Sequence, residues 1–448
     1  MLTRVARNAS FIAVSILLLG GFLFAQRTHE STGVFSQMKF RYIGPPGNRA
    51  ISVASIPGNP DIYYVGAASG GIFKTMDGGI HWESIFDGEP VSSIGSIAIA
   101  PTDSNIVWAG TGEPYIRSHI SIGNGIYKST DAGKTWTHMG LENTGRIGNV
   151  IIDPHDSNIV LACSLGTAYG PQPERGVFRT TDGGKTWQKT LFVDENTGCS
   201  DLGMDPHNSN VLFAGMWQLV IHTWGRTSGG PGSGLFKSTD GGITWKRLEG
   251  HGLPHSPLGR IAVRVAPSDS NRVYAEIETG DGVPFNGEPT QSGQLWRSDD
   301  GGENWQLVNS DRQIRGRTHY YTREEIAPDN ENEVYFFSAA FSRTLDGGKT
   351  LTDMPASPGG DNHEMWIDPT NGNRMAVVND GGVSIAINRG RPNSLQRLRK
   401  QAGWRLISRA KQQPAIRILW KARPRLHFPR RMDGHRRRRK RFRDCRSC

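Results

Sequence analysis

A short octapeptide, S/T-x-D-x-G-x-x-W, recurs along this 448-residue chain and restricts its fold more than any other feature. Intact copies begin at Thr75, Ser129, Thr180, Ser238 and Ser298. A sixth copy, residues 344–351, has Leu in place of Trp, and a seventh, residues 386–393, is degenerate. Self-similarity at a spacing of roughly 50 residues indicates a repeat architecture in which each unit is one small supersecondary structure.

The residues of the octapeptide are those of a hairpin turn. Gly supplies a positive φ, Asp accepts hydrogen bonds from turn amides, and Trp packs beneath the turn. The residues before each copy, such as 71–74 and 234–237, alternate apolar and polar side chains as a half-buried strand does. Each octapeptide therefore closes a two-stranded hairpin, and we interpret its aspartates as structural. They are Asp77, Asp131, Asp182, Asp240, Asp300 and Asp346.

A second motif, a proline turn followed by an apolar strand, alternates with the first. It starts at Pro101, Pro154, Pro206 and Pro267, with weaker copies at Pro57, Pro328 and Pro369. One unit thus holds an inner strand, the proline turn, a second strand, a loop, a third strand, the octapeptide and a fourth strand, which is a propeller blade. We predict an all-β protein, a seven-bladed β-propeller of four-stranded antiparallel blades, over residues 38–390. Residues 39–44 are the expected fourth strand of the last blade.

The octapeptides resemble those of Asp-box, or BNR-repeat, propellers, a group that includes sialidases, xyloglucanase-type glycoside hydrolases and the sortilin-type receptor propeller. Within this group, the chain looks most like bacterial secreted sortilin-like, glycosyl hydrolase-like proteins. Residues 38–390 carry the resemblance, in stretches such as 110–136 and 193–206. The resemblance implies a secreted propeller that acts on or binds an extracellular glycan. The alternative that it implies is a non-catalytic propeller that binds a peptide or protein.

Loop lengths predict which face of the propeller carries function. The octapeptide and proline turns share one end of each blade, so the loops between second and third strands meet at the other end. These loops are long in blades two to five, at residues 110–125, 164–176, 215–234 and 276–294. Four adjacent long loops would wall one half of this face, as expected for a ligand cleft or a partner surface.

The candidate site residues lie on these loops and on the connections between blades. We expect Trp217 and Trp224 to be exposed aromatic residues on Gly-rich loops. The candidate ligand-binding residues are Arg117, Trp217, Trp224, Arg226, Arg317, His319, Tyr320, His363 and Glu364. If the chain is a glycoside hydrolase, Glu113 and Asp361 are the candidate acid and base or nucleophile, and their carboxylates must lie roughly 5 to 9.5 Å apart. A binding protein needs no such pair, so the sequence leaves open whether the chain is an enzyme.

We predict neither a metal nor another cofactor. The densest polar cluster, residues 361–364, lies where a loop enters a strand, so its side chains would point partly to opposite faces. Cys445 and Cys448 form a C-x-x-C pair, but no second pair of zinc ligands lies nearby. Cys163 and Cys199 allow one disulfide bridge.

Residues 1–25 read as a signal peptide, because Arg4 and Arg7 precede an apolar run that is short for a bilayer span. We therefore expect a secreted or periplasmic protein with no transmembrane span after cleavage. Residues 26–37 are a linker. The oligomeric state is left open.

The net charge of +10 is the sum of a strongly basic C-terminal segment and an acidic remainder. Residues 391–448 hold 21 Lys and Arg against two Asp and Glu, so the remainder of the chain is at −9 and offers no field that would attract nucleic acid to the propeller. The regular motifs also stop near residue 391. Two interpretations remain: residues 391–448 are out of frame, or they are a disordered polybasic arm that binds nucleic acid, anionic lipid or envelope polymers.

Overall fold

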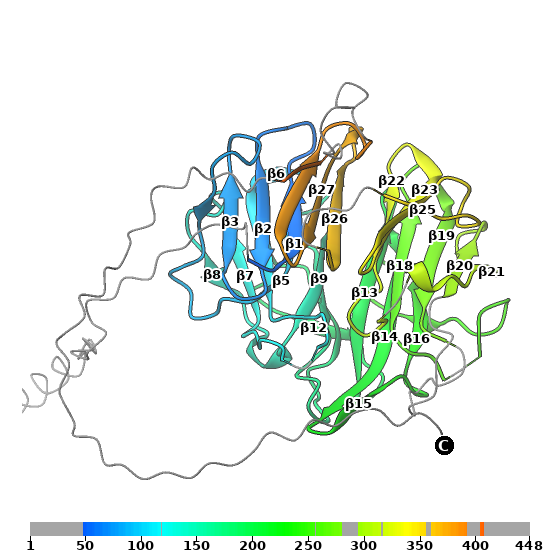
Figure 1. Cartoon of the computed structure of the whole chain (residues 1–448). Helices are drawn as coiled ribbons and strands as arrows, with labels where there is room; N and C mark the ends of the chain where they lie inside the picture. Colours follow the sequence, from blue (N-terminus) through cyan, green and yellow to red (C-terminus); the bar gives the residue numbers. More distant parts are fainter. Residues whose placement is uncertain are drawn as a thin grey trace, which may run out of the picture. The chain divides into compact units, whose positions relative to one another are not determined.

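The computed structural model describes residues 48–117, 119–255, 257–279, 294–314, 317–354, 360–391 and 404–406 (Figure 1). The predicted signal peptide, the linker and most of the basic segment lie outside these residues. Helical structure in the described part is limited to the 3-10 turns η1 (Glu142–Thr144) and η2 (Arg312–Ile314). No helix there has the length and apolar character that crossing a membrane requires.

The strands form seven separate antiparallel sheets, which confirms the predicted seven-bladed β-propeller. Blade one contains β1 (Ala50–Ser55), β2 (Tyr63–Ala67), β3 (Ile72–Thr75) and β4 (Glu83–Ser84). Blade two contains β5 (Ile94–Ala100), β6 (Asp103–Thr111), β7 (Ile126–Ser129) and β8 (Thr137–His138). Blade three contains β9 (Ile147–Ile152), β10 (Val160–Ser164), β11 (Gly176–Thr180) and β12 (Gln188–Leu191).

The remaining blades repeat this order. Blade four contains β13 (Thr197–Asp205), β14 (Asn208–His222), β16 (Gly234–Ser238) and β17 (Lys246–Arg247), and β15 (Gly225–Ser228) pairs with the extended end of β14. Blade five contains β18 (Ile261–Ala266), β19 (Asp269–Ile277), β20 (Gln294–Ser298) and β21 (Gln306–Asn309). Blade six contains β22 (Glu324–Ala327), β23 (Asn330–Phe337), β24 (Phe341–Thr344) and β25 (Thr352–Asp353). Blade seven contains β26 (Asn362–Asp368), β27 (Asn371–Asn379), β28 (Gly382–Ala386) and β29 (Trp404–Leu406).

Blade seven packs against blade one and so closes the ring (Figure 1). Arg374 of β27 is ion-paired with Asp368 at 2.7 Å, and it donates a hydrogen bond to the Ile56 carbonyl at 2.9 Å. Apolar side chains of β1, β2, β27 and β28 form one buried cluster across the same junction. The core therefore lies between successive blades, as a propeller requires.

The outermost strand of blade seven differs from the expectation. It is β29, from the basic segment, and it pairs with β28 in the position expected for residues 39–44. Residues 39–44 themselves lie outside the described part of the chain. The described propeller thus extends past residue 390 into a segment in which the sequence shows no strand pattern.

The octapeptides form the hairpin turns that their composition predicts. In blade four, Asp240 Oδ1 accepts two hydrogen bonds, one from Ser238 Oγ at 2.8 Å and one from the Thr244 amide at 2.9 Å. Gly241 has a φ of 73°, which favours glycine at this position. Some of the tryptophans also bind the preceding blade: Trp187 Nε1 donates to the Met139 carbonyl at 2.7 Å. These contacts support the structural interpretation of the octapeptide.

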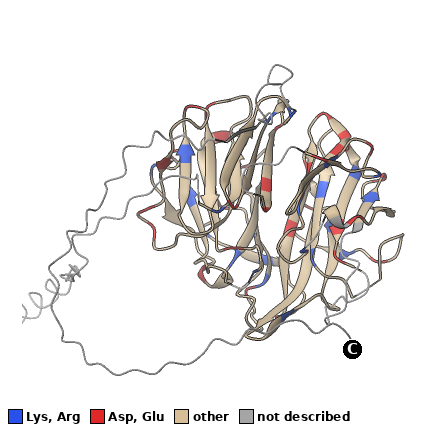
Figure 2. Ribbon diagram, viewed as in Figure 1, with Lys and Arg blue, Asp and Glu red and all other residues tan. Residues whose placement is uncertain are grey.

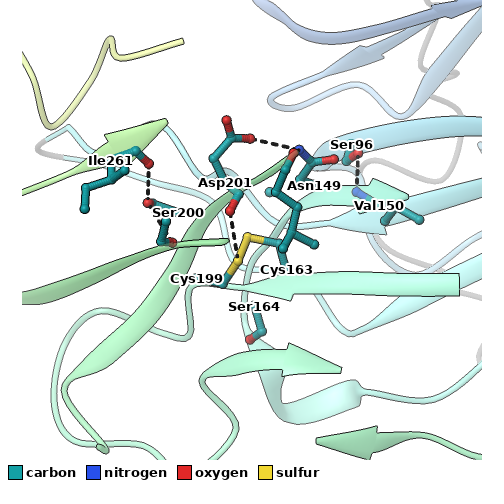
Figure 3. The surroundings of a disulfide bond; sticks show 12 residues. Ser96, Asn149, Val150, Cys163, Ser164, Cys199, Ser200, Asp201 and Ile261 are labelled. Atoms are coloured by element: carbon teal, nitrogen blue, oxygen red, sulfur yellow. Dashed lines mark hydrogen bonds between the residues drawn. A yellow bond between two sulfur atoms is a disulfide. The ribbon is translucent and has the colours of Figure 1, made fainter. Parts of the chain in front are cut away.

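A disulfide joins Cys163 of β10 to Cys199 of β13 and so links blades three and four (Figure 3). Both cysteines are buried in the apolar cluster between these blades. Nearby inner-strand side chains bridge neighbouring blades as well: Ser200 Oγ donates to the Ile261 carbonyl at 2.6 Å. The Val150 amide of blade three likewise donates to Ser96 Oγ of blade two at 3.1 Å, so side-chain contacts join blades two to five in addition to apolar packing.

Candidate functional site

The loops opposite the octapeptide turns interlock, and we call the surface that they form the long-loop face. Residues 112–125 connect β6 to β7, residues 165–175 connect β10 to β11, and the β14–β15 hairpin projects from blade four (Figure 1). The Ile221 amide donates to the Ala168 carbonyl at 2.7 Å, and the Ile116 amide donates to the His319 carbonyl at 3.2 Å. The fourth predicted long loop, residues 276–294, falls mostly outside the described residues.

A second apolar core supports these loops. It joins the long connections of blades two, three and four and consists of Ile116, Ile120, Leu165, Ala168, Trp217 and Leu219, with Ile221 packed against it. A loop that buries its own apolar side chains has fewer conformations than a solvated one. The long-loop face is therefore a packed layer above the blades, and it can hold side chains in fixed positions.

Three buried arginines tie this layer to the blades. Arg146 donates to the carbonyls of residues 120, 166 and 167, and Arg175 donates to those of residues 170, 196 and 219. Arg260 donates to the His319 and Tyr320 carbonyls at 3.0 and 3.4 Å. Among the described residues, none of the three has a carboxylate within ion-pair distance. Burial lowers the pKa of each guanidinium to about 10, so each stays protonated at neutral pH.

The two candidate catalytic carboxylates have unlike surroundings. Glu113 has a fully buried side chain that is ion-paired with Arg49 and with Arg117, whose Nε lies 3.0 Å away. Asp361, with a φ of 48°, is half-buried and accepts a hydrogen bond from the Tyr321 hydroxyl. A fully buried carboxylate that is held by two arginines is not open to a substrate. Glu113 is placed instead to hold the two arginine side chains.

His363 and Glu364 bind different partners, as expected for neighbours on one strand. His363 is buried, with Nε2 at 2.8 Å from Asp380 Oδ1. Glu364 accepts from Arg323 Nη1 at 2.9 Å and from the Val53 amide at 3.1 Å. Burial raises the pKa of Glu364 to about 7, in spite of the opposing effect of Arg323.

Cationic groups collect around residues 317–320. Arg226 and Arg317 are exposed, and the Arg317 guanidinium lies 5.0 Å from the centre of the Tyr320 ring. His319 is buried, and burial together with Arg226, Arg317 and Arg260 lowers its pKa to about 3. The Tyr320 hydroxyl accepts from Arg49 at 3.1 Å and donates to Asp380 at 3.2 Å.

The expectation that Trp217 is exposed is wrong. Its side chain is fully buried in the second core, because β14 continues through the segment that was predicted to be a loop. Its Nε1 donates to Ser228 Oγ at 3.1 Å. Trp224, in contrast, is 84% exposed and stacks on His222, with ring centres 4.9 Å apart and planes 6° apart.

The role of the buried arginines was not predicted from the sequence, although a signal for it was present. An arginine directly precedes the inner strand in four blades, as Arg49, Arg146, Arg260 and Arg323. A basic residue recurring at one blade position predicts a shared structural role. In the described part of the chain, no group of three or more His, Cys, Asp or Glu side chains is arranged to hold a metal ion.

Comparisons with known proteins give two kinds of relative. The Sortilin-Vps10 family model (sortilin, neurotensin receptor 3) matches residues 124–252. The xyloglucanase Xgh74A of Acetivibrio thermocellus is 28% identical over 263 residues, which is 53% of this chain and 29% of the relative. A xyloglucanase of Hypocrea jecorina is 24% identical over 295 residues, or 59% of this chain and 33% of the relative. The chain thus spans about a third of the length of these curated relatives.

Solved structures show the same architecture. The GH74 xyloglucanase from Xanthomonas campestris has a TM-score of 0.58 at 17% identity, with 80% of this chain and 55% of that chain covered. The structure of YCF48 bound to D1 peptide has a TM-score of 0.50 at 16% identity, with 76% of this chain and 94% of that chain covered. At this identity the likeness shows the fold alone. In sequence the chain is therefore similar to the Sortilin-Vps10 family model and to xyloglucanases, and in fold it is a β-propeller like the solved structures.

Proposed function

We propose that this propeller binds an extracellular glycan on its long-loop face. The observation that carries the proposal is the exposed pair of His222 and Trp224, which stack in parallel beside the turn of the β14–β15 hairpin. The Trp224 indole is 84% exposed, so it is accessible to a ligand. Its flat apolar face suits the C–H face of a sugar ring, and its N–H can bond a sugar hydroxyl.

Neighbouring groups support the same function. Tyr169, on the adjacent loop of blade three, is 54% exposed. Arg117, Arg226 and Arg317 add hydrogen-bond donors on the same face. The second core holds the loops in place, so little ordering of the protein should be needed on binding. The xyloglucanase relatives make xyloglucan the first glycan to test.

Binding is proposed here without an assigned catalytic pair. Hydrolysis needs two suitably spaced carboxylates, one of which must be able to donate a proton. Of the two candidates, Asp361 is partly open and Glu113 is enclosed by arginines. Asp361 is therefore the residue to replace in any test of hydrolysis.

We also propose that the chain is exported. The buried disulfide between Cys163 and Cys199 supports this, because structural disulfides persist in oxidising compartments such as the periplasm or the exterior. The sequence of residues 1–25 is consistent with the same route.

Peptide binding is the second candidate. The sortilin family match, residues 124–252, includes the blade-three loop and the β14–β15 hairpin. The similar YCF48 structure was solved with a bound peptide. Both functions would use the same face, so a direct comparison of ligands separates them.

Titration calorimetry of the full chain with a xyloglucan oligosaccharide tests the proposal. We expect binding that Trp224→Ala weakens at least about tenfold and that Leu345→Ala leaves unchanged, because Leu345 is exposed on an octapeptide turn at the opposite end of its blade. If the parent releases new reducing ends from xyloglucan and Asp361→Asn does not, the propeller hydrolyses the glycan as well as binding it. If xyloglucan and acidic glycans all fail to bind while peptides are retained on a peptide array, the peptide candidate replaces the glycan one.

A further inference from the structure

The long-loop face carries an excess of positive charge beside its exposed aromatic pair, because Arg226, Arg260 and Arg317 gather around the single carboxylate of Glu278. We infer that the glycan it takes bears carboxylate groups, as a chain of hexuronic acid residues does, and that Arg226 and Arg317 bind a carboxylate. This inference rests on the proposed function and specifies its ligand class.

Glu278 binds residues that lie next to the two arginines in the chain, and so holds both arginines close together. Its carboxylate accepts from Thr318 Oγ1 at 2.5 Å, from Ser228 Oγ at 2.8 Å and from the Arg260 amide at 2.9 Å. Arg317 directly precedes Thr318. Arg226 lies two residues before Ser228 on β15, so both side chains leave the same face of that strand. The exposed arginines therefore flank a single buried carboxylate.

Hydrogen bonds already use both oxygens of that carboxylate. Neither Arg226 nor Arg317 has an ion-pair partner among the residues that the structure describes. The charges of the two arginines influence each other: burial lowers the pKa of Arg226 first, and the positive charge of Arg317 lowers it further. Buried Arg260, which also has no ion-pair partner among the described residues, adds a third positive charge. An anion bound between these groups would relieve their repulsion.

His319 gives a second, independent indication of a missing ligand. The residue is more than nine-tenths buried, yet its Nε2 has no hydrogen-bond partner within the described part of the chain. Because burial, and then the charges of the neighbouring arginines, lower the pKa of His319 and keep its ring neutral, the ring is suited to share a hydrogen bond with a polar ligand and does not need an ion pair. Buried polar atoms without partners are rare in folded proteins and call for an explanation.

The mixture of groups selects a sugar acid over other anions. Trp224 lies two residues before Arg226 on the same hairpin, so a ring stacked on the indole would place a substituent near the guanidinium. A guanidinium matches a carboxylate with two parallel hydrogen bonds. Figure 2 shows Lys and Arg positions interspersed with Asp and Glu positions along the described strands, whereas nucleic acids are bound mainly through clustered basic residues.

The test compares charged and uncharged sugars of similar size on the full chain. Tetragalacturonate and a neutral xyloglucan oligosaccharide are titrated into the parent, into Arg226→Gln/Arg317→Gln and into Lys134→Gln/Lys185→Gln. The lysine pair is the matched control, because both lysines are exposed on octapeptide turns and their replacement removes the same charge. The basic segment after residue 391 is present in all three proteins, so its attraction for polyanions cancels in the comparison.

We expect the parent to bind tetragalacturonate at least about tenfold more tightly than the neutral oligosaccharide. We expect the arginine variant to lose this preference, the lysine variant to keep it, and the arginine variant to have the same melting temperature as the parent. An equal loss in the lysine variant would overturn the inference, since non-specific charge would then explain the binding. Trp224-dependent binding of the neutral sugar with no preference for the acid would overturn the inference and keep the proposed function. Binding of neither sugar would remove both.

Discussion

At the residue scale, the octapeptide aspartates illustrate how one side chain can be required in every blade without taking part in chemistry. Asp240 accepts hydrogen bonds from the Thr244 amide and hydroxyl and from Ser238, and these contacts lower its pKa to about 2. The same pattern, with a pKa of about 2, holds for Asp77, Asp131, Asp300 and Asp346. Because the folded state favours the ionised form of these five carboxylates, the free energy of unfolding should fall when acid protonates them.

This linkage predicts the direction of acid unfolding. A carboxyl whose pKa is near 2 when folded and near 4 when unfolded stabilises the fold above about pH 4, and the contribution disappears as the pH falls towards 2. The midpoint of urea unfolding should therefore fall steeply over this window. Asp240→Asn should have a lower midpoint at pH 7 and a shallower fall below pH 4. An unchanged slope would show that the turn does not hold its carboxylate as described.

The two hairpin tryptophans should behave in opposite ways. Trp217 is fully buried in the second core and Trp224 is exposed, so Trp217→Ala should reduce the free energy of unfolding by about 3–5 kcal/mol. Trp224→Ala should leave it nearly unchanged. Chemical denaturation of both variants checks this, and similar losses in the two would contradict the assigned burial.

At the element scale, the sequence predicts local features well and non-local ones poorly. The proline turns and octapeptides are local signals, and they were enough to predict seven four-stranded blades. The burial of Trp217 depends on loops from three blades packing together, and the pairing of Arg49 with Glu113 joins two blades, so neither is visible in a short stretch of sequence. The continuation of β14 into a hairpin was also missed, because Gly-rich residues 225–234 look like a loop.

The disulfide is a link between elements whose removal can be measured. Cys163 and Cys199 enclose a sequence separation of 36 residues, for which loop-closure entropy predicts a stabilisation of about 4 kcal/mol. Reductant under denaturing conditions should therefore lower the unfolding midpoint of the parent. Cys163→Ala/Cys199→Ala should start lower and should not respond to reductant. A midpoint in the parent that is insensitive to reductant would argue against the bridge.

At the scale of the whole molecule, the two ends of the blades have separate roles. The octapeptide turns repeat almost identically around the ring, whereas the opposite loops differ from blade to blade and bury a core of their own in blades two to four. Blade seven closes the ring against blade one, with β29 as its outer strand. A repeated scaffold that positions one variable surface is a common basis for binding proteins.

Ligand binding on the long-loop face can be tested without choosing a residue in advance. Hydrogen–deuterium exchange of the full chain is measured with and without saturating xyloglucan oligosaccharide, and separately with tetragalacturonate. We expect slower exchange in peptides from residues 112–125, 165–175 and 215–234, with no change in peptides that cover the octapeptide turns. Protection confined to those turns, or no protection with either glycan, would contradict this expectation.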